Sequence, residues 1–408
     1  MREMKDSGIP WIGEIPKEWE TKNIGQFYTH RVEKVSDKDY APLSVTKNGI
    51  VPQLETAAKT DDGDNRKLVR VGDFCINSRS DRRGSCGISP YDGSVSLINT
   101  ILTPRSEMSP RYYDWLFHTT MFADEFYKWG HGIVDDLWTT RWQEMKRIAI
   151  PTPSLAEQQR IAEFLDRKCA EVDEMIGLQE QIIEELKAYK QSVITEAVTK
   201  GLTPAAPMRD SGIEWIGQIP EHWEVSKVKW ECAIMDYLRE PISAENRKNE
   251  LGLYDYYGAS GVIDKIDDYN VDDKVLLIGE DGANLVMRNL PLVYKAEGKF
   301  WVNNHAHILK PLANNCYSYM AYMLEAGDYT HYITGSAQPK LSQENIKNFI
   351  SPMPRDYTEQ QAIADYLDEK CANIDALIAI KQQKIDSLKE YKKSIIYEYV
   401  TGKREVNE

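Results

Sequence analysis

Residues 157–176 read EQQRIAEFLDRKCAEVDEMI, and the chain returns to this pattern at residues 359–378 as EQQAIADYLDEKCANIDALI. The likeness continues through AYKQSVITEAVT, which starts at Ala188, and EYKKSIIYEYVT, which starts at Glu390. A solenoid of short units needs at least three repeats, whereas this chain has two copies with a long period. The pattern therefore predicts a duplicated domain with pseudo-twofold internal symmetry.

Each copy carries the signals of one long helix. Ser154 and Glu157 have the spacing of a capping box, Asp356 and Glu359 repeat it, and each pattern ends at a glycine. The spacing predicts two helices of about 45 residues, or about 65–70 Å at 1.5 Å per residue. Helices of this length exceed those of ordinary globular domains.

Steps of four and three residues trace a heptad seam along each helix. The two seams consist of Leu165, Cys169, Val172, Ile176, Gln179, Ile183, Leu186, Lys190, Val193 and Ala197, and of Leu367, Cys371, Ile374, Ile378, Lys381, Ile385, Leu388, Lys392, Ile395 and Tyr399. We expect the helices to pair with each other as an antiparallel coiled coil. The alternative is that each helix packs only on its own domain. The polar seam positions either fix the register or extend toward solvent.

A second repeat opens each half of the chain. DSGIPWIGEIPKEWETK at 6–22 returns as DSGIEWIGQIPEHWEVS at 210–226, and the segments 25–150 and 227–350 that follow share little identity. We therefore expect an α+β protein in which two globular domains are joined by two long helices. The expected boundaries are a first globular domain at 1–153, a first long helix at 154–201, a second globular domain at 202–355 and a second long helix at 356–408.

Composition limits the classes of partner and compartment. The chain has 408 residues, of which 64 are acidic and 50 basic, so its formal net charge is −14. Such a chain has no general positive field to attract nucleic acid, and any DNA contact would be local. The sequence shows no apolar run that would span a membrane and no signal-peptide pattern, so we expect a cytoplasmic protein. The six cysteines form no CxxC pair, which is typical of reduced thiols.

Motifs for catalysis are missing from the sequence. It contains no Pro-Pro pair for an adenine-methyltransferase loop, no GxxxxGK[ST] phosphate loop and no HExxH. The pair His305 and His307 would need a third ligand to hold a metal, and we expect ordinary polar contacts instead. Two adjacent acid pairs, Glu280–Asp281 and Asp135–Asp136, leave a two-carboxylate hydrolase as a further hypothesis. We expect no catalytic residue and no metal site.

The two openings, together with IAIPTPSLAEQQRIAEFLD, ISPMPRDYTEQQAIADYLD and GSAQPKLSQENIKNFI, resemble the specificity subunit of type I restriction-modification enzymes over essentially the whole chain. The resemblance implies a non-catalytic subunit whose two recognition domains each read one half of a bipartite double-stranded DNA target. It also implies partners: methyltransferase subunits, expected to number two, that methylate adenine, and restriction/motor subunits for cleavage. S-adenosylmethionine, ATP and Mg would bind to those partners and not to this chain. The competing hypothesis is a coiled-coil interaction scaffold without DNA readout.

Base edges are read by Arg or Lys on guanine, Asn or Gln on adenine, and Asp or Glu on cytosine. In the first domain the loop NSRSDRRGSCG is the densest basic cluster, and its alternative role is a solvated loop with internal Arg–Asp pairs. The turn KNG and the segment before the first long helix add further donors, although KNG is also a plain hairpin signal. The predicted DNA-binding residues of this domain are Lys47, Asn48, Arg79, Asp81, Arg82, Arg83, Thr140 and Arg141.

In the second domain GEDGANLVMR and KFWVNNHAHILKP combine turns with Asn, Asp, Arg and His. The alternative is that Asn303 and Asn304 close a turn while the histidines face a half-polar interior. Thr139–Arg141 aligns with Gln338–Lys340 ahead of the second long helix, although the surrounding stretches, DDLWTTRWQEMKRIAI and GSAQPKLSQENIKNFI, differ. The predicted residues here are Asp281, Asn284, Arg288, Asn303, Asn304, His305, Gln338 and Lys340.

Overall fold

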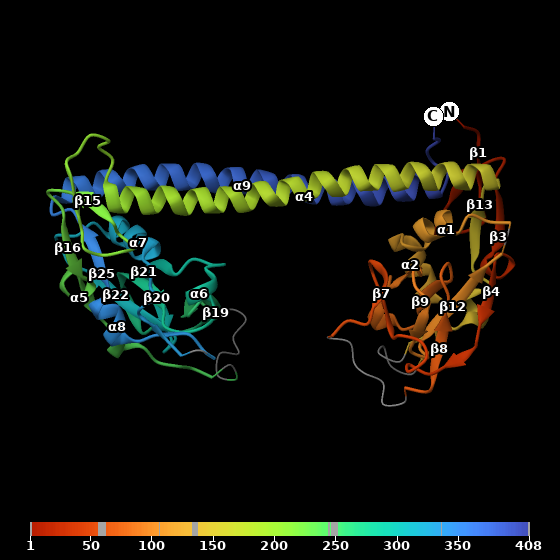
Figure 1. The fold of residues 1–408 in the computed structure, drawn as a ribbon, viewed down its shortest axis with the longest axis horizontal. Coiled ribbons are helices and arrows are strands. Elements are labelled where there is room, and N and C mark those ends of the chain that lie inside the picture. The colour runs from red at the N-terminus through yellow and green to blue at the C-terminus, as the bar shows by residue number, and fades with distance from the viewer. Residues whose placement is uncertain are drawn as a thin grey trace. The chain divides into compact units, whose positions relative to one another are not determined.

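The computed structural model describes residues 2–55, 63–105, 107–132, 138–243, 245, 252–335 and 337–406 (Figure 1). The chain divides into two compact units, of which unit 1 comprises Met1–Glu180 and Gln383–Glu408 and unit 2 comprises Gln181–Gln382. Each unit therefore combines one α+β domain with half of each long helix. Asp135 and Asp136, one of the acid pairs considered above, lie outside the described residues.

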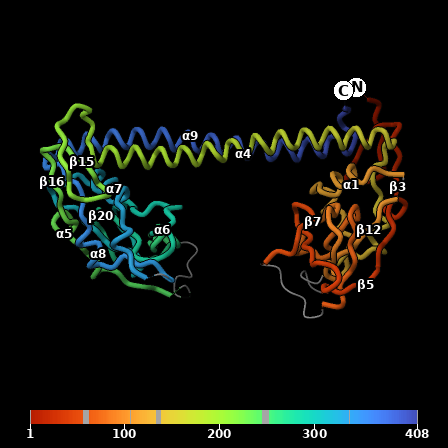
Figure 2. The backbone as a smooth tube through the Cα atoms, viewed as in Figure 1, coloured from red at the N-terminus to blue at the C-terminus, as the bar shows by residue number. Residues whose placement is uncertain are grey.

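The two long helices are α4 (Leu155–Lys200) and α9 (Tyr357–Val400). Within unit 1 the first half of α4 packs against the last half of α9, and within unit 2 the last half of α4 packs against the first half of α9. The smooth tube of Figure 2 shows this pairing, with α4 in yellow-green beside α9 in blue. The helices form an antiparallel pair, as the heptad seams predict.

Most of the apolar seam positions are buried at this helix pair. In unit 1 they include Leu165, Cys169 and Val172 of α4 and Ile385, Ile395 and Tyr399 of α9. The polar seam position Lys392 forms an ion pair with Asp173 in unit 1, and Lys190 forms the matching pair with Asp375 in unit 2. Both helices need the partner because neither α+β domain covers the whole apolar stripe.

The helix starts differ from the expected capping boxes. The Ser154 hydroxyl accepts from the backbone N–H of Glu157 at 3.3 Å, and the Asp356 carboxylate accepts from that of Thr358 at 2.9 Å. The glutamate side chains do not complete the box. The Glu157 carboxylate instead accepts from the Trp19 indole at 2.9 Å, and the Glu359 carboxylate accepts from Trp223 at 3.0 Å. This matched pair of contacts joins each repeated opening to its long helix.

Unit 1 is built from short antiparallel sheets covered by helices α1 (Pro110–Phe117) and α2 (Thr120–Lys128). Its central sheet has the order β10-β9-β12-β4, and its second sheet has the order β11-β8-β5. The other elements are hairpins and edge pairs that frame these sheets. The strands are β1 (Met4–Asp6), β2 (Glu14–Pro16), β3 (Glu20–Asn23), β4 (Tyr28–Arg31), β5 (Lys34–Val35), β6 (Leu43–Thr46), β7 (Gly49–Pro52), β8 (Arg66–Val69), β9 (Phe74–Asn77), β10 (Cys86–Ile88), β11 (Gly93–Val95), β12 (Asn99–Pro104) and β13 (Ala149–Thr152).

Unit 2 has one larger sheet of order β17-β22-β20-β21-β18-β19, covered by helix α7 (Tyr317–Ala326). Its short helices are α5 (Val228–Glu231), α6 (Asn284–Met287) and α8 (Gln343–Asn348). The strands are β14 (Met208–Asp210), β15 (Gln218–Pro220), β16 (Glu224–Lys227), β17 (Cys232–Ile234), β18 (Tyr254–Gly258), β19 (Gly261–Ile266), β20 (Val271–Gly279), β21 (Val293–Val302), β22 (Ala306–Pro311), β23 (Ile333–Thr334), β24 (Lys340–Leu341) and β25 (Ile350–Met353).

The dissimilar stretches ahead of the two long helices adopt the same local structure. In unit 1 the short helix α3 (Trp142–Met145) leads into β13, which pairs with β3. In unit 2 helix α8 leads into β25, which pairs with β16. The repeat therefore extends further in structure than in sequence.

All six cysteines are buried free thiols. In the described part of the chain, neither the two long helices nor the shorter ones contain an apolar stretch that could span a bilayer.

Candidate nucleic-acid interface

Three chain segments of unit 1 meet beyond the end of strand β9. The backbone N–H of Ser78 donates to the carbonyl of Ile98 at 3.3 Å, and that of Ser80 donates to the carbonyl of Trp138 at 3.1 Å. The N–H of Thr140 returns a hydrogen bond to the carbonyl of Ser78 at 3.0 Å. These bonds hold the basic loop between two segments that are distant in sequence.

Unit 2 repeats this arrangement beyond the end of strand β20. The N–H of Glu280 donates to the carbonyl of His305 at 2.8 Å, and the N–H of Gly282 donates to that of Pro339 at 3.0 Å. The N–H of Leu341 donates to the carbonyl of Glu280 at 2.7 Å. We call this arrangement the three-segment frame; it comprises residues 78–82, 96–98 and 138–140 in unit 1 and residues 280–284, 303–305 and 339–341 in unit 2.

The frame corrects the alignment of the two units. Thr140 occupies the position of Leu341, so Thr139 matches Lys340, two residues away from the match with Gln338 expected from sequence. Isolated bridges join Arg79 to Thr139 and Asp281 to Lys340, which supports the same correspondence. The shift explains why Thr140 is buried, since Leu341 is buried as well.

The side chains of the unit 1 loop are paired but exposed. The Asp81 carboxylate lies 3.6 Å from Arg79 and 3.7 Å from Arg82, and the Arg82 side chain keeps 69% of its surface exposed. Arg83 forms an ion pair with Asp124 on helix α2. The internal Arg–Asp pairs considered as the alternative are therefore present. Such exposed pairs are weak and exchange readily for a phosphate or a base edge.

Lys47 comes close to this loop through the turn between strands β6 and β7. Lys47, Asp81 and Arg82 line one groove of about 550 Å³. A Cβ atom on Gly87 would lie 2.8 Å from the Cα of Gly49, so this close approach requires glycine. The remaining lining residues are Leu43, Ser44, Val45, Thr46, Gln53, Leu54, Arg66, Asn77, Ser85, Ser96, Ile98 and Asn99.

Three other predicted residues of unit 1 have different surroundings. Thr140 is fully buried, and its hydroxyl donates to the carbonyl of Phe126 at 2.7 Å, so the prediction that its side chain contacts DNA is wrong. Asn48 sits in the hairpin turn, where its N–H donates to the Thr46 hydroxyl at 3.1 Å, and it does not line the groove. Arg141 is exposed beside the frame.

In unit 2 the frame brings three of the predicted residues together. The His305 ring lies 2.7 Å from the Asp281 carboxylate, and Lys340 lies 3.0 Å from the carboxylate of Glu280. The His305 and Lys340 side chains are about half exposed, and Asn304 and Gln338 are exposed nearby. This surface offers donors and acceptors from all three segments.

Two predicted asparagines of unit 2 make hydrogen bonds that shape the loops. Asn303 is 5% exposed, and its side-chain oxygen accepts from the N–H of His305 at 2.8 Å, as the turn-closing alternative expects. The side chain of Asn284 bonds the backbone of Leu290 in both directions, at 2.9 and 3.1 Å. Both were predicted to contact DNA. Asn303 is buried and engaged within the protein, whereas Asn284 is only half-buried, and a DNA contact by Asn284 stays a prediction.

Arg288 ends helix α6 in a left-handed conformation with φ 54°. Its guanidinium donates to the carbonyl of Gly327 at 2.7 Å and lies over the ring of Tyr329. These contacts fix the end of the loop. The guanidinium has further N–H donors beyond the one that bonds Gly327, so a DNA contact by Arg288 stays a prediction.

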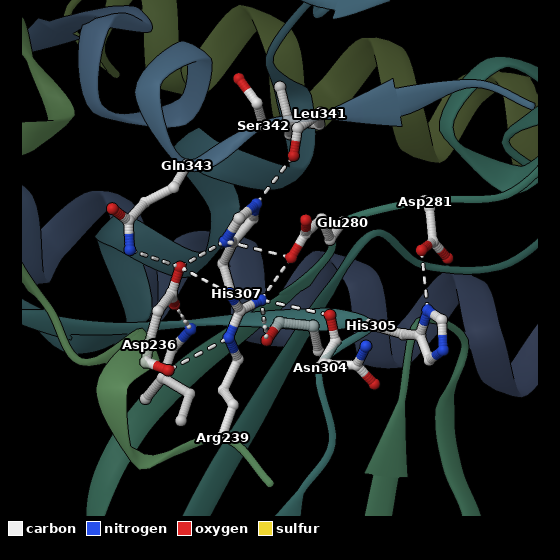
Figure 3. Close-up of polar contacts among 12 residues, drawn as sticks. Asp236, Arg239, Glu280, Asp281, Asn304, His305, His307, Leu341, Ser342 and Gln343 are labelled. Atoms are coloured by element: carbon white, nitrogen blue, oxygen red, sulfur yellow. Dashed lines mark hydrogen bonds and ion pairs between the residues drawn. The ribbon is translucent and has the colours of Figure 1, made fainter. Parts of the chain in front are cut away.

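A largely buried polar network connects the three segments of the unit 2 frame (Figure 3). His307 is fully buried, and its two ring nitrogens lie 2.7 Å from the Asp236 carboxylate and 2.8 Å from the carbonyl of Leu341. Arg239 forms an ion pair with Glu280 and donates to the carbonyl of Asn304 at 3.3 Å. The network therefore ties all three segments of the frame to strand β22 and to the 3-10 turn at 236–238.

The same contacts determine the ionisation of the two carboxyl groups. Burial alone would raise the pKa of Asp236, but hydrogen bonds from His307, the backbone and Gln343 outweigh it and lower that pKa. Burial likewise opposes ionisation of Glu280, and the cations Arg239 and Lys340 lower its pKa overall. Both groups are carboxylates at neutral pH, which keeps the network electrostatically paired.

Sequence reasoning missed Asp236 and Arg239 as well as Ser96, Leu97 and Ile98, the middle segment of the unit 1 frame. Leu97 and Ile98 are about 40% exposed although they are apolar. The segment connects strand β11, which begins at a glycine, to strand β12. This place in a short connection is the sequence signal that could have suggested a surface role. Asp236 and Arg239 pair with each other three residues apart, but the partners that join them to the frame and to strand β22 lie 41 to 107 residues away, and the local spacing does not indicate those contacts.

The two histidines have separate carboxylate partners, Asp281 for His305 and Asp236 for His307. Across the described part of the chain, no group of three or more His, Cys, Asp or Glu side chains is arranged to hold a metal ion. The carboxylate of Glu280, which was one candidate for a hydrolytic group, forms ion pairs with Arg239 and Lys340.

Comparison with known proteins gives a family match over most of the chain. The family model for the type I restriction modification DNA specificity domain matches residues 16–188 and again residues 220–402. A putative type I restriction enzyme MjaX specificity subunit from Methanocaldococcus jannaschii is 24% identical, with 96% of this chain and 95% of that protein covered. The type I restriction enzyme EcoKI specificity subunit from Escherichia coli is 35% identical over 26% of this chain and 20% of its own length.

Two solved structures share the fold. A chain from a study of complex assembly and conformational transition of the type I R-M system has a TM-score of 0.71 at 15% identity, with 96% of this chain and 99% of that chain covered. The HsdS subunit from Thermoanaerobacter tengcongensis has a TM-score of 0.51 at 16% identity, with 96% and 98% covered.

Proposed function

Because the chain belongs to the type I restriction-modification DNA specificity family, as a non-catalytic specificity subunit with two recognition domains, we propose that each three-segment frame reads one half of a bipartite DNA target. In this proposal, methyltransferase subunits, two in number, dock on the chain and methylate adenine with S-adenosylmethionine. A restriction/motor subunit that uses ATP and Mg joins for cleavage, and the complex works in the cytoplasm.

The observation that carries the proposal is that the two frames have the same backbone hydrogen-bond pattern but present different side chains. On the first segment of the frame, unit 1 presents Arg79, Asp81 and Arg82 where unit 2 presents Asp281. Unit 2 adds His305 and Lys340 on the other two segments, where unit 1 has Ile98 and Thr139. A common scaffold that carries different donors and acceptors suits two half-sites of different sequence, because base edges are distinguished by donor and acceptor patterns.

Exposed apolar residues add to the unit 2 surface. Val286 and Met287 on helix α6 are 63% and 64% exposed, directly after the first segment of the frame. Apolar side chains at such a place suit contact with thymine methyl groups.

An exchange of residues 25–150 for the matching segment of a related subunit tests the proposal. Methylated adenines in a host that carries the exchanged chain should lie in sites of which one half has changed and the other half has not. A coiled-coil scaffold without DNA readout would leave the methylated sequence unchanged in both halves. That result would contradict our proposal.

The isolated chain should bind DNA weakly because its net charge of −14 limits counterion release. Tight binding then requires the methyltransferase subunits to enclose the duplex. Titration of a labelled duplex at physiological salt, with and without those subunits, measures the difference. Equal affinities would contradict this part of the proposal.

A further inference from the structure

The end of helix α4 in unit 2 and the end of helix α9 in unit 1 carry the same pattern but have different surroundings. In unit 2 a groove of about 480 Å³ runs along Gln191, Thr195 and Thr199 of α4 and reaches Trp215 and Ile216 of the repeated opening. The matched positions in unit 1 are Lys393, Tyr397 and Thr401, beside Trp11 and Ile12.

In unit 1 the chain fills this place with its own side chains. The Tyr397 ring stands where unit 2 has the smaller Thr195, and its hydroxyl donates to the carbonyl of Ile12 at 3.3 Å. Lys403, in the segment that follows helix α9, donates to the same carbonyl at 2.6 Å. The Lys403 ammonium also lies 4.6 Å from the centre of the Tyr397 ring. An aromatic ring and a cation together occupy the unit 1 site.

The segment after Lys403 completes the closure. Arg404 pairs with Glu398 at 3.3 Å, and its N–H donates to the carbonyl of Glu398 at 3.1 Å. Val406 packs against the unit 1 core. Residues 403–406 thus cover the end of their own helix.

In unit 2 the corresponding groups have no such cover. Glu196, which matches Glu398, lines the groove, is exposed and has no ion pair among the residues that the structure describes. The carbonyl of Ile216 also lacks a hydrogen-bond partner within that part of the chain, whereas the matched carbonyl of Ile12 accepts two. The buried indole N–H is without a partner among the described residues of both units, at Trp11 and at Trp215. Leu202 and Thr203, which follow the helix end, line an adjoining pocket that shares Ser192, Glu196 and Lys200 with the groove and lies on the way to strand β14.

We propose that the unit 2 groove is a docking site for a protein segment that inserts an aromatic ring beside Thr195 and places a Lys or Arg between Glu196 and the carbonyl of Ile216. The occupant is a partner protein and not a second copy of this chain, because each copy already uses Lys403–Val406 to cover unit 1. The inference rests on the proposed function, since a methyltransferase subunit is the partner that would supply the segment. The two units are then unequal docking places despite their internal repeat.

The test uses the full chain and the methyltransferase subunit of the same host as the probe. Thr195→Tyr introduces into the groove the ring that fills the unit 1 site, and Glu196→Lys reverses the charge that should receive the cation. Lys187→Tyr is the matched control, since it adds the same ring to an exposed position of α4 outside the groove. Titration calorimetry gives the affinity and the number of subunits bound, and circular dichroism checks that each variant folds.

We expect both groove variants to weaken binding of one methyltransferase subunit by at least about tenfold, as for the loss of an aromatic anchor, while Lys187→Tyr binds normally. If the original chain binds the subunit and Thr195→Tyr binds it equally well, the docking site is refuted and the proposed function stands. If the original chain binds no methyltransferase subunit, both are refuted. Loss of self-association in Thr195→Tyr, with methyltransferase binding intact, would identify a second copy as the occupant and also overturn the proposal.

Discussion

The Lys392 ammonium of helix α9 lies 2.7 and 2.6 Å from the two carboxylate oxygens of Asp173 on helix α4. Lys190 and Asp375 form the same contact in unit 2, with the roles of the two helices exchanged. Each lysine occupies a polar position of the apolar seam, and each aspartate lies on the opposite helix. The pairs therefore bind the antiparallel helices to each other at matched positions of both units.

Asp173→Asn should lower the free energy of unfolding by about 0.5 kcal/mol, the usual size for an ion pair that is largely exposed. The side chains of Lys392 and Asp173 are 27% and 57% exposed, so solvent screens their attraction. Urea unfolding at low and high salt measures the effect, which should shrink as salt rises.

The charge-swapped double variant Asp173→Lys with Lys392→Asp provides the control for this pair. It should regain most of the stability that either single change removes, because the attraction is restored in reverse. A double variant that is as unstable as the sum of the two single variants would show that the pair does not stabilise the helices.

The long helices could be predicted from sequence because their signals are local and repeated. Cap residues mark where α4 and α9 begin, glycines mark where they end, and the heptad seam identifies the buried face. The role of Glu157 could not be predicted, since its spacing to Ser154 indicates a capping box while its carboxylate bonds Trp19, 138 residues earlier. The local spacing of Ser154 and Glu157 does not reveal that a residue distant in sequence competes for the Glu157 carboxylate.

The candidate site could be predicted only in part. The loops that carry Arg82 and Asp281 were predicted from residue type and turn chemistry, and the segment that carries Lys340 was predicted from its place ahead of the second long helix. The structure places all three residues on the two frames. Thr140 and Asn303 are of the right residue type but are buried, because the frame turns their side chains inward. Which member of a polar loop faces solvent depends on strand pairing across the whole domain, and the sequence of the loop does not contain that information.

The Trp–Glu contacts that join the repeated openings to the long helices should stabilise both units. Trp19→Phe removes the indole donor to Glu157, whose side chain is 11% exposed, and should cost about 1–2 kcal/mol of unfolding free energy. Trp223→Phe should cost less, since Glu359 is 26% exposed. Each carboxylate keeps a second partner in the variant, Arg2 for Glu157 and His222 for Glu359. Chemical denaturation of the two variants measures both values. Equal stability of Trp19→Phe and the original chain would contradict the role of this hydrogen bond.

Acid should destabilise unit 2 through the network under its frame. The pKa values of Glu280 and Asp236 are lowered in the folded protein, so these groups contribute stability above their unfolded pKa values of about 4. That contribution is lost as the pH falls through the lower folded values. Glu280→Gln should therefore be less stable than the original chain at pH 7, and the difference should shrink toward pH 3.

Thermal unfolding across this pH range checks the acid effect. Glu214→Gln is the matched control, because Glu214 is exposed and has no ion pair among the described residues of unit 2. The control should show a small difference that does not change with pH. A Glu280→Gln difference that stays constant from pH 7 to pH 3 would exclude Glu280 as the source of acid sensitivity.

Substitutions on the two frames should separate the two half-sites. Lys340→Ala removes an exposed cation from the unit 2 frame, and Arg82→Ala removes one from the unit 1 frame. Each should weaken binding of the assembled complex to its target by about 1–3 kcal/mol if it contacts a base, and should relax the sequence at one half-site only. If it contacts a phosphate, binding should weaken for all sequences and the salt dependence should become less steep. Competition assays with duplexes altered in one half or the other distinguish these outcomes, and relaxation of the same half-site by both variants would show that the two frames do not divide the target between them.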